Sequence, residues 1–156
     1  MIRINVILDN ISWKKYIKNP KSYFRYKIDK LNKKNKLYKK NCLVFTLMLS
    51  RSSKIKQLNK KFRNKNKSTD VLSFPFYNKV ELLKLLKVKN KKEIFIGDII
   101  INLQKIRNKS DKKNFLIELD KLWVHGLAHL FGHRHKIDRD FFKMNKIEKE
   151  FLKHLN

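Results

Sequence analysis

Four of the five histidines in the chain, His125, His129, His133 and His135, lie within eleven consecutive positions. Histidine is a frequent ligand of transition metals, so this clustering indicates a metal site. A helix is predicted over the first two, which are four residues apart and therefore lie on one face, about 6 Å apart along the axis. Both rings can then reach one ion.

The third ligand has to be His133 or His135. If the helix continued to His133, this residue would lie about 12 Å along the axis from His125, rotated by about 80°. Two imidazoles bound to one ion at about 2.0 Å cannot be so far apart. Gly132 can adopt a positive φ and end the helix, so that the chain turns back and presents His135. We predict that His125, His129 and His135 bind one metal ion, with His133 beside them.

Three histidines with an open coordination position are typical of catalytic zinc, although the same ligands suit nickel and copper. The spacing H-x-x-x-H-x-x-G-x-x-H also matches the metzincin proteases. Those enzymes need glutamate directly after the first histidine as general base, and this chain has Gly126 there. The sequence therefore argues against a metalloprotease.

A second stretch, LNKKFRNKNKSTDVLSFPF at 58–76, completes a pattern with VHGLAHLFGHRH at 124–135. Together they resemble the YbeY family of bacterial endoribonucleases, whose pattern is roughly L-N-x-x-[YF]-R, T-D-V-L-S-F-P, G-D-I and H-G-x-L-H-L-x-G-Y-D-H. The matching residues are Leu58, Asn59, Phe62 and Arg63, then Thr69 to Pro75, then Gly97, Asp98 and Ile99, then His125, Gly126, His129, Leu130, Gly132 and His135. The chain departs from the pattern at His133-Arg134, where the family has Tyr-Asp.

The resemblance implies hydrolysis of single-stranded RNA, linked to 16S rRNA 3′ end maturation and ribosome quality control. It implies one zinc ion held by the three histidines, which activates water. Arg63 would bind the scissile phosphate, and its alternative role is a surface arginine paired with Asp70 or another acid. Asp70 would orient the loop after Arg63, and Asp98 would support the site, although both also suit structural roles.

The net charge is +27 over 156 residues, with 33 lysines and 7 arginines. Such charge fits an RNA partner: pre-16S rRNA and the small ribosomal subunit, with its proteins. The alternative explanation is an AT-rich genome, which favours lysine codons on any solvated face. A hydrophobic fraction of 42% excludes a disordered tail. The single Cys42 forms no internal disulfide, and neither a signal peptide nor a membrane span is recognisable, so we expect a cytoplasmic protein.

The length predicts one domain, 1–156. Strands are expected at 2–8, 42–50, 71–74 and 93–101, and helices at 20–37, after a Ser52 or Ser53 cap, at 81–86, from 102 to 132 with an interruption near 110, and at 138–155. These elements predict an α+β (mixed α/β) fold: one mixed sheet of about four strands flanked by helices. The fold would be zincin-like, with the metal site on a long helix and the turn after it. A non-catalytic ribosome assembly factor, with a structural metal, is the alternative function.

Overall fold

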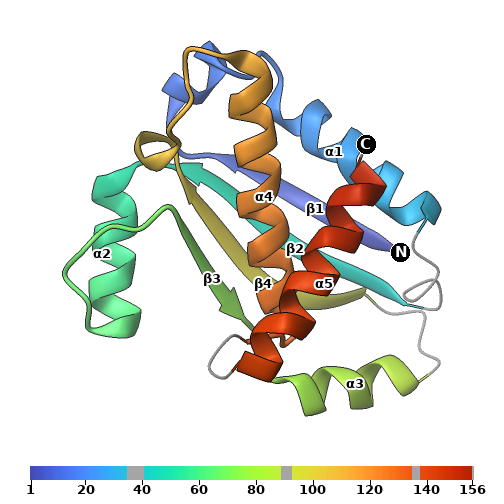
Figure 1. Cartoon of the computed structure of the whole chain (residues 1–156). Helices are drawn as coiled ribbons and strands as arrows, with labels where there is room; N and C mark the ends of the chain where they lie inside the picture. Colours follow the sequence, from blue (N-terminus) through green and yellow to red (C-terminus); the bar gives the residue numbers. More distant parts are fainter. Residues whose placement is uncertain (35–40, 89–92, 135–137, 156) are drawn as a thin grey trace.

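Four strands form a mixed sheet (Figure 1). The computed structural model describes residues 1–34, 41–88, 93–134 and 138–155. The strands are β1 (Ile2–Leu8), β2 (Cys42–Ser50), β3 (Val71–Pro75) and β4 (Glu93–Asn102), in the order β1-β2-β4-β3. The strands β1, β2 and β4 are parallel, whereas β3 runs antiparallel to β4. The predicted mixed sheet of about four strands is therefore confirmed. Pro75 ends the edge strand β3, where its missing N–H disturbs no inner ladder.

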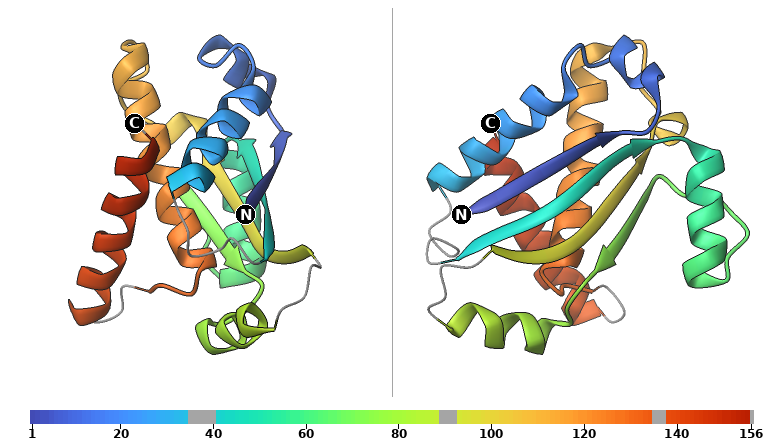
Figure 2. Two further views of the ribbon diagram at one scale, coloured as in Figure 1. Left: turned by 90° about the vertical axis from the view of Figure 1, so that its right-hand side faces the viewer. Right: turned by 180° about the vertical axis from the view of Figure 1, so that it is seen from behind.

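One face of the sheet carries α1 (Pro20–Lys34), α4 (Lys112–Leu130) and α5 (Asp138–Leu155), as the views in Figure 2 show. The main hydrophobic core fills this layer, and Leu47, Ile99 and Leu127 are fully buried in it. Asp111 begins α4 by accepting the backbone N–H groups of Lys113 and Asn114. The core thus fixes α4, the helix that carries the histidines, against the sheet.

The opposite face carries α2 (Ser52–Arg63), whose Ile55 packs on Leu72 and Ile100. The predicted serine cap of this helix is wrong. Arg51 occupies the N-cap position without a side-chain cap, and the Ser52 N–H donates instead to Gln104 Oε1 at 2.9 Å. A glutamine from a distant part of the chain satisfies this N–H, so local sequence alone does not reveal the helix start.

The predicted helix from 102 to 132 begins later in the structure. The strand β4 continues through Asn102, a 3-10 turn follows at Leu103–Lys105, and α4 starts at Lys112. Asn102 is fully buried, and its side-chain amide donates to Ser52 Oγ and to the Thr69 carbonyl. These bonds connect the end of β4 to the start of α2 and to the loop before β3. The helix α5 has the predicted bounds, and positions 35–37 of the first predicted helix lie outside the described residues.

The remaining helix, α3 (Lys79–Lys87), lies beyond the end of β3 (Figure 1). Asn78 and Glu81 form a reciprocal capping box at its start. Among the described residues, no helix is long and apolar enough to cross a bilayer.

Candidate active site

His125 and His129 face one another on α4. Their Nε2 atoms are 3.2 Å apart, and the two rings are nearly perpendicular, with an interplanar angle of 88°. Two imidazole nitrogens bound to one tetrahedral ion at about 2.0–2.1 Å would be separated by about 3.3 Å. The spacing between these nitrogens therefore fits a shared metal ion.

The other ring nitrogens are held by two different acceptors. His125 Nδ1 lies 2.9 Å from Glu148 Oε1 of α5, and His129 Nδ1 lies 2.9 Å from the His133 carbonyl. A carbonyl and a carboxylate accept, so each Nδ1 carries the proton and each Nε2 presents a lone pair. This is the usual arrangement of metal-binding histidines, whose second nitrogen donates to a fixed acceptor. The donor set of the pair thus fits a transition metal.

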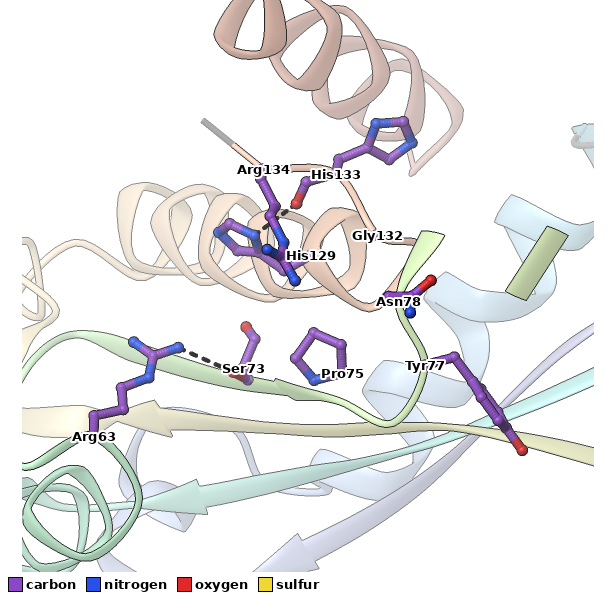
Figure 3. A pocket seen from close by; sticks show the side chains of 9 residues that line it. All are labelled: Arg63, Ser73, Pro75, Tyr77, Asn78, His129, Gly132, His133 and Arg134. Carbon is purple, nitrogen blue, oxygen red and sulfur yellow. Dashed lines mark hydrogen bonds between the residues drawn. The ribbon is translucent and has the colours of Figure 1, made fainter. Parts of the chain in front are cut away.

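Gly132 ends α4 as predicted. Its φ is +79°, its N–H donates to the His129 carbonyl at 2.9 Å, and the His133 N–H donates to the Ala128 carbonyl at 3.1 Å. Both bonds belong to a Schellman motif, which needs a left-handed residue at this position. The turn also brings the His133 carbonyl to His129 (Figure 3).

The ring of His133 points away from His129 in Figure 3. Burial lowers the pKa of His133, and the nearby Lys79 ammonium lowers it further, so the ring is neutral near pH 7. In the part of the chain that the structure describes, no third His, Cys, Asp or Glu side chain joins the two Nε2 atoms in a group that could hold a metal ion. The predicted third ligand, His135, lies outside the described residues.

Gly126 packs directly on the sheet. A Cβ atom at this position would lie 2.7 Å from Ile99 Cγ2. The position at which metzincin proteases carry their glutamate therefore faces the core between α4 and β4, and a larger side chain has no room there. The geometry agrees with the sequence argument against a protease.

An open cleft of about 340 Å³ lies between β3 and the end of α4, a volume within the range of small-molecule sites. Its lining residues are Arg63, Ser73, Pro75, Tyr77, Asn78, His129, Gly132, His133 and Arg134 (Figure 3). The structure thus brings the predicted Arg63 and His129 to one cleft, from the end of α2 and from α4.

Arg63 is held by the edge strand. Its Nη2 donates to the Ser73 carbonyl at 3.1 Å, and its guanidinium lies 5.8 Å from the centre of the Phe74 ring. The alternative pairing of Arg63 with Asp70 or another acid is wrong for the described residues, among which Arg63 forms no ion pair. Asp70 Oδ1 instead accepts from Thr69 Oγ1 and from the Val71 N–H. Asp70 therefore stabilises the turn before β3, and the Arg63 guanidinium lines the cleft without an acidic partner among the described residues.

Asp98 lies on the other face of the sheet. Its neighbours Gly97 and Ile99 approach α4, so the alternation of β4 directs Asp98 away from that helix. It lines an apolar groove together with Thr46, Phe62 and Phe76. Burial raises the pKa of Asp98, and a hydrogen bond with Thr46 opposes the shift. The predicted support of the metal ligands by Asp98 is therefore wrong.

Sequence reasoning missed Glu148 as the partner of His125, and it did not place Tyr77 and Asn78 in the lining of the cleft. Glu148 is separated from His125 by 23 positions, so no local spacing connects them. The one available signal was its position four residues after the buried Met144, which places an acid beside the packed face of α5.

One mixed sheet of four strands flanked by helices, with the H-x-x-x-H pair on the long helix α4, is the mixed α/β architecture that the sequence predicts. A family model described as Endoribonuclease YbeY matches residues 8–156. An Endoribonuclease YbeY of Pelagibacter ubique is 40% identical over 95% of this chain and 92% of its own length. One of Thermodesulfovibrio yellowstonii is 35% identical over 83% and 75%. A solution structure of a Thermotoga maritima protein aligns with a TM-score of 0.53 at 25% identity, covering 99% of this chain and 89% of that one. The chain belongs to the YbeY endoribonuclease family.

Proposed function

We propose that this protein is a metal-dependent endoribonuclease that cleaves single-stranded RNA in the maturation of the 16S rRNA 3′ end and in ribosome quality control. The observation that carries the proposal is the cleft that His129 and Arg63 line together, with the Nε2 atoms of His129 and His125 only 3.2 Å apart. Pre-16S rRNA in the small ribosomal subunit would be the substrate, with small-subunit proteins as further partners. Such a role implies the cytoplasm.

In this proposal His125, His129 and His135 hold one zinc ion, or nickel or copper, per chain. A metal ion held there would polarise a phosphoryl oxygen and lower the pKa of water to about 7. Glu148 and the His133 carbonyl keep the two Nδ1 protons in place and so fix the ring orientation. Arg63 binds the scissile phosphate and stabilises the charge that develops on its oxygens. Its bond to Ser73 orients the guanidinium before RNA arrives.

The experiment compares metal-loaded protein, chelated protein and the His129→Ala variant on labelled single-stranded and duplex RNA. Metal content is measured by mass spectrometry and folding by circular dichroism. We expect only the metal-loaded parent to cut, with single strands preferred and the chelated protein still folded. A non-catalytic assembly factor would instead unfold on chelation. A folded, metal-loaded protein that binds RNA but never cuts it would refute the enzyme proposal.

A further inference from the structure

We propose that Arg134 forms a second phosphate-binding site, which holds the RNA phosphate next to the scissile one. The inference rests on the proposed function, since it names how that site recognises its substrate. Arg134 follows the turn at Gly132 and is exposed, and it lines the same cleft as Arg63 and His129. In Figure 3 its side chain runs from the turn past His129 toward β3.

The two arginines approach the cleft from separate elements. Arg63 belongs to the last turn of α2, whereas Arg134 belongs to the segment after α4. Arg63 already donates to the Ser73 carbonyl, which restrains its fork. Arg134 makes no hydrogen bond or ion pair with any other described residue, so its donors remain available to a ligand. Two guanidinium groups that come from separate elements, one restrained and one without a partner among the described residues, suit two successive phosphates better than one.

The charges around the cleft favour an anion. No lysine, aspartate or glutamate lines it among the described residues, yet the chain holds 33 lysines and 7 arginines. Two of these few arginines therefore meet in one cleft of a lysine-rich protein. The planar fork of arginine binds phosphate with two parallel hydrogen bonds, which the lysine ammonium does not provide. A lining with two such forks and no carboxylate matches a nucleic-acid backbone.

The substrate class follows from this pairing. A substrate with one phosphodiester engages Arg63 alone, whereas a longer strand engages Arg63 and Arg134 together. The protein should therefore prefer a single strand with at least two consecutive phosphodiesters across the cleft. The position carries aspartate in the family pattern, so Arg134 reverses the charge at this point of the cleft lining.

The test measures cleavage of trinucleotides and dinucleotides by the metal-loaded parent, Arg134→Ala and Arg134→Lys. For trinucleotides we expect KM to rise roughly ten- to a hundred-fold in Arg134→Ala, the loss typical of a charged hydrogen bond, with kcat little changed. Arg134→Lys should recover part of the loss. Dinucleotides with one phosphodiester should show no such difference. Arg25→Ala removes the same charge from an exposed position of α1 and should behave as the parent.

A methylphosphonate scan locates the contact. Replacing the neighbouring phosphate with this uncharged group should raise KM of the parent, and Arg134→Ala should then add nothing further. An undiminished effect of Arg134→Ala at every methylphosphonate position would overturn the proposal, as would an equal effect on dinucleotides. Loss of metal from Arg134→Ala would also overturn it, because the side chain would then act through the turn. If the parent fails to cut RNA, the proposed function fails, and the same scan read by fluorescence anisotropy still decides the Arg134 contact.

Discussion

Two acceptors of different kind orient the histidine pair, and only one of them belongs to a side chain. Glu148 accepts from His125, whereas His129 depends on a backbone carbonyl. In Glu148→Gln the charged acceptor becomes a neutral amide, which weakens the basicity of His125 as a ligand. We expect metal affinity to fall roughly ten- to a hundred-fold, measured by competition with a coloured chelator.

Glu150→Gln is the matched control for that change. It removes the same charge from an exposed position two residues further along α5, and metal affinity should stay at the parent value. Equal losses in both variants would mean that the general charge of α5 matters and not the contact with His125.

Substitutions at Arg63 distinguish a catalytic role of this residue from a structural one. In Arg63→Ala one charged donor leaves the cleft, and turnover of single-stranded RNA should fall on the order of a hundred- to a thousand-fold. Metal content and melting temperature should change little, because the residue is exposed and its bond to the Ser73 carbonyl lies at a sheet edge. Arg63→Lys keeps the charge without the fork and should recover only part of the rate. Normal single-turnover rates in a less stable Arg63→Ala would instead assign the arginine to the fold.

Among the elements, the contact of α4 with β4 depends on Gly126. Alanine in a helix interior normally stabilises by about 1 kcal/mol over glycine. Here the added Cβ would lie 2.7 Å from Ile99 Cγ2, and overpacking of this kind typically costs about 1–3 kcal/mol. We therefore expect Gly126→Ala to lower the free energy of unfolding, measured by urea denaturation.

Making Gly126→Ala in an Ile99→Ala background tests whether the clash with Ile99 causes the loss of stability. It removes the atoms that the new Cβ would meet, so Gly126→Ala should cost less there than in the parent, or even stabilise. The same penalty in both backgrounds would place the strain elsewhere.

The two faces of β4 also differ in their response to pH. Burial raises the pKa of Asp98, so the folded state binds a proton there more tightly than the unfolded chain. The ionised carboxylate therefore destabilises the fold above its raised pKa and has no such effect below about 3.9. Asp98→Asn should raise the melting temperature at pH 7, and the gain should vanish toward pH 4. Asp29→Asn, at an exposed position of α1, should give no gain at either pH.

At the level of elements, the strands and most helices were predictable because their apolar periodicity is strong. The end of α4 was predictable too, since the helix ends in a residue with positive φ and glycine, here Gly132, adopts that conformation most readily. The start of α2 was not, because a distant glutamine serves its first N–H. The motif alone indicated Arg63 as a site residue. Its hydrogen-bond partner could not be predicted, because the acceptor is the Ser73 backbone carbonyl and every residue type carries such a group. Glu148 depends on how α5 packs across α4, and local sequence does not encode that arrangement.

For the whole molecule, a net charge of +27 should govern the association with RNA. Each phosphate that a lysine or arginine neutralises releases counterions, so the logarithm of affinity should fall by about 0.7 per contact for each unit of log salt on single strands. A titration from about 50 to 200 mM salt measures the number of contacts. A slope near zero would assign the lysine excess to genome composition.

The packing of Gly126 on Ile99 also means that this protein cannot acquire the glutamate of the metzincin proteases by one tolerated substitution. The single substitution Gly126→Glu would supply the missing glutamate, but its carboxylate would enter an apolar interior without a partner, which is strongly unfavourable. A lineage that moved between peptide and RNA hydrolysis would first have to shift the helix away from the sheet, through intermediates with a damaged core. The shared histidine spacing is thus not evidence that one activity lies a mutational step from the other.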